Sequence, residues 1–188
     1  RRLPSTPHLP DGVFVEDAAV VLDDVAVITR PGAPSRQPET ASVEAALAAH
    51  RPLVHVHAPA TLDGGDVLVA GRRIYIGLST RTSRAAIQQL TDQLARHGYE
   101  VIPLAFTGCL HLKSAVTRIA DDLMLVNPAW VEADAFAGYR ALTVDPAEPH
   151  AANALALGDA VVHPLQHVRT RARLEAAGLT VVTVPQME

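Results

Sequence analysis

The chain has 188 residues, of which 48% are hydrophobic and 19% charged, a balance typical of globular proteins rather than disordered or fibrous ones. Its formal net charge is −4 and no basic stripe runs along it, which argues against a nucleic-acid partner. The one cysteine, Cys109, excludes an intramolecular disulfide framework and favours a reducing, cytoplasmic location. No apolar run reaches the roughly 18 residues that a membrane span needs, so we expect no membrane association.

The elements follow one order along the chain. Residues 18–31 predict a β-hairpin whose turn is formed by Asp23 and Asp24. Apolar residues at helical spacing then predict a helix over 42–50, and a lone strand follows at 53–57. A helix, a lone strand, a loop and a hairpin form the unit that the remaining sequence repeats.

The next hairpin is expected at 66–78, and a helix over 83–97 follows it. This helix has the clearest boundaries, because Ser83 can cap its start and Gly98 follows its end. The elements expected after it are a strand at 100–106, a hairpin at 116–128, a weaker helix at 131–139, a strand at 140–144, a hairpin at 154–164, a helix at 170–177 and a strand at 180–184.

The recurrence has a period of roughly 40–50 residues and indicates pseudo-symmetric α/β repeats within a single domain, 1–188. The last repeat stops after its lone strand, at Glu188, and the first hairpin has no helix before it. We therefore expect the chain to lack part of a larger circular array at both ends. The alternative is a natural terminus with an irregular last repeat. The repeats fall at about 9–38, 39–81, 82–129, 130–167 and, incomplete, 168–188.

Equivalent loops of the repeats carry the side chains that could take part in catalysis or ligand binding. These are Asp11, Glu16 and Asp17 in the first loop, Asp63 in the next and His111 in the one after. Loops that point to one axis would gather these side chains in one pocket. One of the two adjacent acids must face inward, where a guanidinium would satisfy it, and Asp63 could orient the imidazole of His111. The alternatives are a solvated strand edge for the acids and a core position for the histidine.

Three further residues allow two interpretations each. Cys109 is either a nucleophile or a small buried side chain. Arg36 and Arg81 lie in loops after the first and second hairpins. Each could clamp a carboxylate bidentately or remain solvated.

Five segments in fixed order carry a specific resemblance: PDGVFVEDAAVV, ITRPGAPSR, LDGGDVL, GLSTRTS and LHLKS. Together they resemble the dimethylarginine dimethylaminohydrolase family of the guanidino-group-modifying superfamily. The resemblance runs over residues 9–188 and implies the five-bladed α/β-propeller, or pentein, fold. Arginine deiminases and amidinotransferases share this fold, but Lys113 and Ser114 resemble the dimethylaminohydrolase version of the motif.

The resemblance implies the substrate-binding residues. The acid that holds the substrate guanidinium matches Asp17, with Asp11 and Glu16 as further acids around it. Arg36 and Arg81 match the two arginines that engage the amino-acid end of the substrate. Phe14 matches an aromatic residue that lines the pocket.

The resemblance also implies the catalytic residues. His111 matches the general acid/base, and Asp63 matches its carboxylate partner. The nucleophilic cysteine of the family belongs to a C-terminal GG-x-x-C segment that these 188 residues do not contain, and Cys109 does not match it. We therefore expect these residues alone to be inactive and the missing thiol to lie beyond Glu188.

The implied activity is hydrolysis of methylated arginine to citrulline and methylamine or dimethylamine, without a metal or an organic cofactor. A homodimer is compatible with the sequence. Four alternatives remain: another guanidino-group hydrolase or amidinotransferase, a non-catalytic guanidine-binding module, a site in which Cys109 is the nucleophile, and a role in assembly alone.

Overall fold

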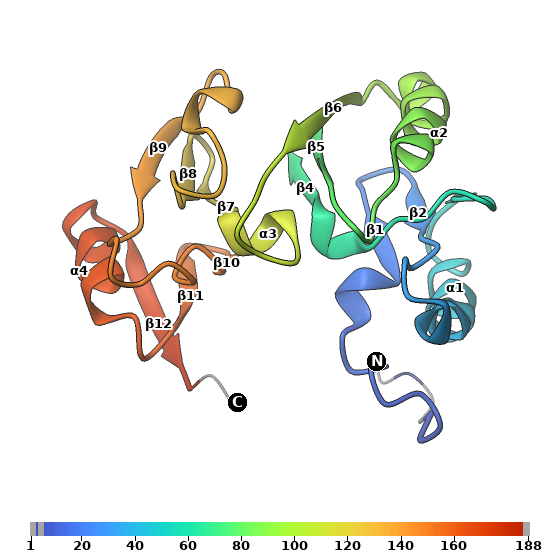
Figure 1. Cartoon of the computed structure of the whole chain (residues 1–188), viewed down its shortest axis with the longest axis horizontal. Coiled ribbons are helices and arrows are strands. Elements are labelled where there is room, and N and C mark those ends of the chain that lie inside the picture. The colour runs from blue at the N-terminus through green and yellow to red at the C-terminus, as the bar shows by residue number, and fades with distance from the viewer. Residues whose placement is uncertain (1–2, 4–5, 186–188) are drawn as a thin grey trace. The chain divides into compact units, whose positions relative to one another are not determined.

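The strands form four three-stranded sheets. The computed structural model describes residue 3 and residues 6–185 (Figure 1); the last three residues of the incomplete fifth repeat lie outside this part. Along the chain the sheets are β1-β2-β3, β4-β5-β6, β7-β8-β9 and β10-β11-β12. The first two strands of each sheet form an antiparallel hairpin. The third strand pairs parallel to the second in the first, third and fourth sheets.

The chain divides into two compact units, Arg1–Leu104 and Ala105–Glu188. The single-domain interpretation stays a prediction. The elements of the first unit are β1 (Ala19–Val21), β2 (Ala26–Ile28), α1 (Thr40–Leu47), β3 (Leu53–His55), β4 (Val67–Ala70), β5 (Arg73–Leu78), α2 (Arg84–Leu94) and β6 (Glu100–Ala105), the last residue of which belongs to the second unit.

Helix α2 anchors the core of the first unit. Its residues Ile87, Leu90 and Leu94 are buried in one cluster with the inner faces of sheets β1–β3 and β4–β6. The Ser83 hydroxyl accepts a hydrogen bond from the backbone N–H of Ala86 at 3.3 Å, which caps the helix. This packing fixes the ends of the strands, from which the loops described below project.

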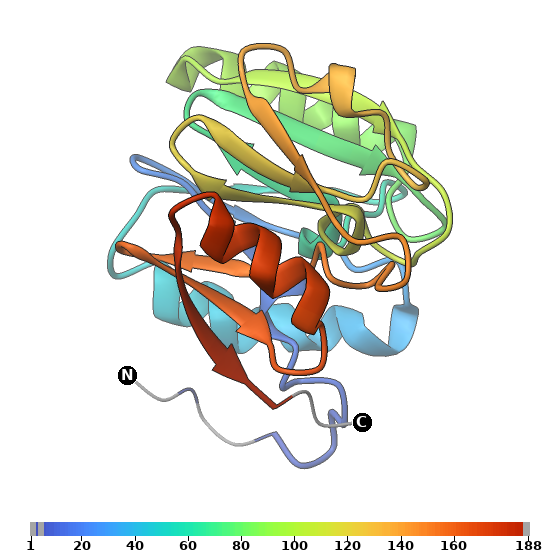
Figure 2. The same ribbon diagram turned by 90° about the vertical axis from the view of Figure 1, so that its left-hand side faces the viewer.

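The second unit repeats the same plan. It contains α3 (Leu112–Ala115), β7 (Val116–Ala120), β8 (Leu123–Val126), β9 (Arg140–Thr143), β10 (Leu155–Leu157), β11 (Ala160–Pro164), α4 (Val168–Ala176) and β12 (Thr180–Val184). Helix α4 lies along β12 (Figure 2). Its Leu174 is buried with Ile119, Leu125 and Val161. Exposed apolar side chains on the β10 and β12 strands include Leu155, Leu157, Val182 and Val184.

The four predicted hairpins and the four lone strands are confirmed, with ends shifted by a few residues. The helices predicted at 42–50, 83–97 and 170–177 are also present. Each lone strand lies in the sheet of the hairpin that precedes it. The repeat in space is therefore hairpin, helix and strand, which is the predicted cycle divided at a different point.

The helix predicted over 131–139 is wrong, because only a single 3-10 turn, Ala133–Ala135, forms there. Both buried apolar side chains of this segment, Val131 and Phe136, are five residues apart. That spacing places them about 140° apart around a helix, so they cannot share one helical face. Irregular backbone ending at Gly138, whose φ is +91°, lets both reach the core.

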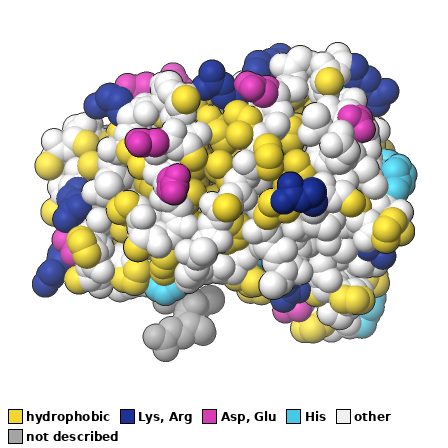
Figure 3. Space-filling model, turned by 45° about the horizontal axis from the view of Figure 1, so that its top comes forward, with side chains coloured by type: hydrophobic (Ala, Val, Ile, Leu, Met, Phe, Trp, Pro, Cys, Tyr) yellow, Lys and Arg dark blue, Asp and Glu magenta, His cyan; other side chains and the backbone are white. Residues whose placement is uncertain are grey.

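The face in Figure 3 carries acidic and basic side chains interspersed with hydrophobic ones. Among the described residues, no helix combines the length and the apolar character that a membrane span needs.

Candidate functional site in the first unit

Asp17 lies at the centre of a hydrogen-bonded group of loops in the first unit. It ends the 3-10 turn Val15–Asp17, directly before β1, and is only 7% exposed. One carboxylate oxygen accepts a hydrogen bond from Nη1 of Arg36 at 2.6 Å, and the other accepts one from the backbone N–H of Gly65 at 2.8 Å. Glu16 is exposed. The prediction that one of these adjacent acids faces inward is confirmed, and the inward acid is Asp17.

Arg36 is buried and bonded mainly to carboxylates of its own unit. It belongs to the 3-10 helix Pro34–Glu39 and donates to Glu39 from Nε at 3.1 Å and from Nη2 at 2.9 Å. Nη2 also donates to the carbonyl oxygen of Phe14 at 3.1 Å. Burial alone would lower the pKa of Arg36, but the hydrogen bonds to Glu39 and Asp17 outweigh it and raise the pKa above its ordinary value. A direct contact between Arg36 and the amino-acid end of a substrate stays a prediction.

Asp63 is the second buried acid of the site, with 1% of its surface exposed. Its carboxylate accepts a hydrogen bond from the backbone N–H of Gly32 at 2.7 Å. Its own N–H donates to the hydroxyl of Thr82 at 3.2 Å. A carboxylate oxygen of Asp63 lies within 4.8 Å of one of Asp17. Two carboxylates this close repel each other, so they favour a cation beside them.

Two glycines permit the close packing of these loops. A Cβ at Gly64 would collide with the carbonyl oxygen of Glu16, and a Cβ at Gly32 would lie 2.5 Å from the carbonyl oxygen of Arg81. The Gly-Gly loop was expected to allow close approach of a ligand or another strand. In the structure, Gly64 lies against the backbone of Glu16. The sequence did not predict that Gly32 allows a similar close approach to the backbone of Arg81.

Asp66 is a further buried acid that the sequence analysis did not assign. It is fully buried and accepts hydrogen bonds from the hydroxyls of Ser79 at 2.6 Å and Thr82 at 2.7 Å. The Ser79 oxygen in turn accepts the backbone N–H of Arg81 at 2.9 Å. Asp66 thus fixes the loop that carries the half-buried Arg81. An acid in the apolar segment GGDVLV was the available signal for this residue.

The other predicted binding residues lie on the same acidic loop. Phe14 is 58% exposed, and the guanidinium carbon of Arg36 lies 5.9 Å from the centre of its ring. Asp11 is half-buried, and its carbonyl oxygen lies 3.4 Å from Nη2 of Arg36. The loop therefore depends on Arg36 for its conformation. Whether its side chains contact a substrate stays a prediction.

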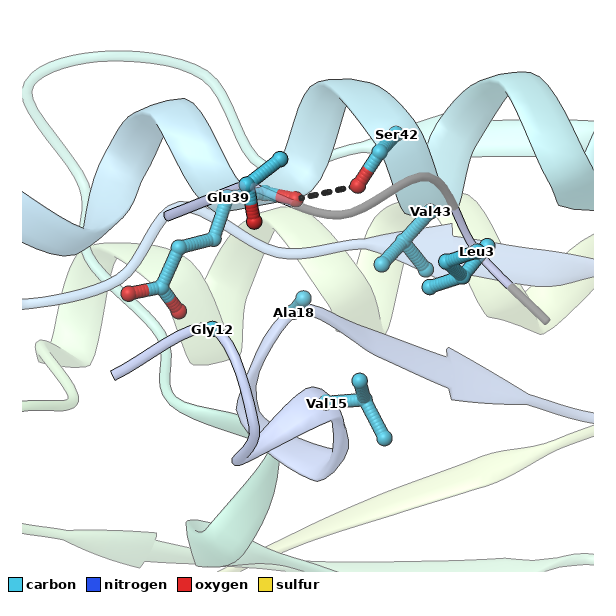
Figure 4. Close-up of a pocket in the computed structure, with 8 residues that line it drawn as sticks. Leu3, Gly12, Val15, Ala18, Glu39, Ser42 and Val43 are labelled. Atoms are coloured by element: carbon cyan, nitrogen blue, oxygen red, sulfur yellow. Dashed lines mark hydrogen bonds between the residues drawn. The ribbon is translucent and has the colours of Figure 1, made fainter. Parts of the chain in front are cut away.

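A small cavity lies behind this loop (Figure 4). Its walls include Leu3, Gly12, Val15, Glu39 and Val43. Its volume is about 30 Å³, which is enough for about two water molecules. Ligand pockets usually measure about 300–1,000 Å³, so this cavity is not the substrate pocket.

His111 and Cys109 belong to the second unit. His111 directly precedes α3 in extended conformation, and Leu112 and Ala115, both fully buried, anchor this short helix. The Cys109 thiol donates a hydrogen bond to the backbone carbonyl of His111 at 3.2 Å. Because Asp63 belongs to the first unit, its pairing with His111 stays a prediction.

Comparison with known proteins shows which proteins the chain resembles in sequence. Residues 5–148 match the sequence profile of the arginine deiminase family. An N(G),N(G)-dimethylarginine dimethylaminohydrolase of Streptomyces coelicolor is 50% identical over 117 residues, which cover 62% of this chain and 45% of that protein. The protein of the same name from Pseudomonas aeruginosa is 31% identical over 188 residues, which cover 99% of this chain and 74% of that protein.

Solved structures of other proteins share the repeated arrangement of sheets found in this chain. The Pseudomonas aeruginosa enzyme, as a cysteine-to-serine mutant in complex with citrulline, matches 96% of this chain and 71% of its own with a TM-score of 0.90 and 30% identity. The N-terminal domain of ArgZ, a cyanobacterial arginine dihydrolase, shares the fold with a TM-score of 0.86 at 20% identity, covering 97% of this chain and 72% of its own. The four mixed sheets are therefore part of a pentein α/β propeller.

Proposed function

The chain belongs to the dimethylarginine dimethylaminohydrolase family, within the arginine deiminase or pentein superfamily, and we propose that its protein hydrolyses Nω-methylated arginine to citrulline and methylamine or dimethylamine. One observation carries this proposal above the others. Asp17 and Asp63 are buried within 4.8 Å of each other and are held there by backbone N–H groups and by Arg36. Such a pair is complementary to a flat cation that donates several hydrogen bonds, which is the character of a guanidinium.

In the first half of the proposed reaction, Asp17 and Glu16 hold the substrate guanidinium in one plane, which orients its central carbon for attack. A cysteine thiolate adds to that carbon. The positive guanidinium beside the thiol favours the thiolate form. His111 gives a proton to the departing nitrogen, the bond from carbon to methylamine or dimethylamine breaks, and a thiouronium adduct remains on the sulfur.

In the second half, the neutral imidazole of His111 takes a proton from water. The hydroxide adds to the same carbon, and the carbon–sulfur bond breaks with its electron pair on the sulfur, which leaves as a thiolate. The added hydroxyl group gives its proton to solvent as citrulline forms, and the released amine takes up a proton from solvent. Asp63 would hold the imidazole in the required orientation. Neither half needs a metal or an organic cofactor. The thiol is not assigned to Cys109, because its position in the sequence does not match that of the nucleophile in the family motif.

The amino-acid end of the substrate would be bound by Arg81 and Arg36, the two arginines that match the family's motif positions. The single cysteine of the sequence fits a reducing cytoplasm.

Citrulline release from Nω,Nω-dimethylarginine by the full-length protein tests the proposal. We expect turnover in the wild type and its loss in His111→Ala and in Asp17→Ala. Cys109→Ser should retain activity, since that thiol is not the nucleophile. An intact, folded protein that releases no citrulline would contradict the proposed hydrolase, and an inactive Cys109→Ser variant would reassign the nucleophile.

A non-catalytic guanidine-binding module is the second candidate, because the sequence holds the binding acids and a histidine but only one thiol, in an unmatched position. Calorimetric binding of methylarginine by the full-length protein without product would favour this candidate. Wild-type affinity in Asp17→Ala would argue against both candidates and for a role in assembly.

A further inference from the structure

Glu39 is a buried acid at the site that neither the motifs nor the resemblance singles out. It ends the 3-10 helix Pro34–Glu39, and its side chain is only 6% exposed. Its carboxylate receives two N–H edges of Arg36, Nε at 3.1 Å and Nη2 at 2.9 Å. Asp17 binds the same guanidinium through Nη1 at 2.6 Å. One buried cation is therefore divided between two buried acids.

The division has an electrostatic consequence. The group of Asp17, Arg36 and Glu39 carries a formal charge of −1. If Glu39 were neutral, the charge of Arg36 would fall on Asp17 alone, and the group would carry no net charge. Asp17 would then attract a second guanidinium much less strongly, because charges in a partly buried site act through a lower dielectric constant than water.

The division also has a geometric consequence. Nη2 of Arg36 donates both to Glu39 and to the carbonyl oxygen of Phe14. The edge held by Glu39 therefore sets the plane of the guanidinium and, through it, the position of the acidic loop. In Figure 4 the carboxylate of Glu39 extends away from Ser42 and Val43 and toward the segment that contains Gly12. Glu39 thus acts on the site through Arg36.

We propose that Glu39 is a positioning residue that gives the site its preference for cationic guanidines over neutral ureas, by taking part of the charge of Arg36 away from Asp17. The inference rests on the proposed function, since it assumes that Asp17 receives the substrate guanidinium. The inference explains why the site would bind the substrate, which carries a charged guanidinium, more tightly than citrulline, which carries an uncharged urea in its place.

The test compares two ligands in three forms of the full-length protein. Nω,Nω-dimethylarginine carries the cation and citrulline does not. Their dissociation constants are measured by calorimetry, or as KM and the inhibition constant of citrulline where the substrate turns over. The forms are the wild type, Glu39→Gln and the control Glu44→Gln. Glu44 is a half-exposed acid of α1 that pairs with His55 at 2.9 Å, so the control removes the same charge outside the Arg36 group.

In Glu39→Gln we expect the ratio of substrate affinity to citrulline affinity to fall by roughly threefold to tenfold, as for one charge removed from a partly buried group. The ratio in Glu44→Gln should stay within about twofold of the wild type, because exposed charges are screened. An equal loss for both ligands would mean that Glu39 only supports the fold, and an unchanged ratio would also overturn the inference.

Two further outcomes keep the inference separable from the proposed function. If the wild type binds neither ligand, the proposed function fails and the inference with it. If Glu39→Gln does not fold, as judged by circular dichroism, Glu39→Asp replaces it. The shorter side chain keeps the charge but lengthens its bonds to Arg36, so a smaller fall in the same ratio is expected, and no fall would overturn the inference.

Discussion

Replacing Arg36 by methionine tests whether the buried ion group stabilises the first unit. The side chains of Arg36, Asp17 and Glu39 are 10%, 9% and 6% exposed. Methionine keeps the apolar volume but removes the cation between two carboxylates. Breaking a buried pair costs about 3–5 kcal/mol, and the lost bond to the Phe14 carbonyl adds about 1 kcal/mol. We expect Arg36→Met to lower the free energy of unfolding of this unit by about 4–6 kcal/mol at pH 7.

A second variant separates charge from packing. In the double variant Arg36→Met/Glu39→Gln the cation is also lost, but one buried carboxylate remains in the group instead of two. The loss that Arg36→Met causes in the Glu39→Gln background should therefore be smaller than the loss it causes in the wild type. A loss caused by poor packing would be equal in both backgrounds.

The assay is native-state hydrogen exchange in urea, which follows amides of the acidic loop and of β1 separately from the second unit. The control is Arg73→Met, which removes an exposed pair with Glu100 at 3.5 Å and should cost at most about 1 kcal/mol. A loss in Arg36→Met no larger than that of the control, or one equal in the wild-type and Glu39→Gln backgrounds, would refute the reasoning.

Three other changes have definite expected outcomes. Gly64→Ala should destabilise the first unit by at least about 2 kcal/mol in urea unfolding, because its Cβ would collide with the Glu16 carbonyl; wild-type stability would contradict that close approach. Ser83→Ala should cost about 1 kcal/mol through the lost cap of α2, read as faster exchange of the first amides of that helix, and unchanged exchange would show that the cap is dispensable. His163 is fully buried and bonded to the Ala151 carbonyl, and burial lowers its pKa. As the pH falls through about 6.5, the histidine takes up a proton more readily in the unfolded chain than in the folded one. The thermal stability of the second unit should therefore fall between pH 7 and pH 5. His163→Gln should flatten that slope in melts followed by Trp130 fluorescence, and an unchanged slope would assign it to other groups.

The elements that the sequence predicted well are those determined by local pattern. Each hairpin consists of two short apolar runs around a polar turn, and its pairing involves residues fewer than about ten positions apart. The start of α2 at Ser83 is equally local, since a capping hydroxyl contacts an N–H three residues on. No helix forms over 131–139, because the apolar residues of this segment that are buried do not lie on one helical face.

The contacts that the sequence did not predict all join distant loops. Arg36 lies 19 residues from Asp17, and Gly32 and Asp63 are 31 residues apart. Neither pairing has a periodic signal. The sequence predicted from strand alternation that one of the two adjacent acids faces inward. One does, although both lie in a 3-10 turn rather than in a strand, and the sequence could not show which group satisfies that acid. Arg36 was expected to clamp a ligand carboxylate, which stays a prediction; in the structure it binds the carboxylates of Asp17 and Glu39.

The bonds from Arg36 to these carboxylates change how the acidic loop should be understood. An ionised carboxylate offers about four lone-pair positions, and the bonds from Arg36 and Gly65 use at least two of those on Asp17. A substrate guanidinium at Asp17 would therefore share the carboxylate with a protein guanidinium of the same shape and charge. The affinity of the site then depends on how firmly the internal cation is held elsewhere. Among the described residues bonded to Arg36, Glu39 is the other acid that holds it, so selectivity for the substrate charge would be set by an acid outside the recognised motif positions.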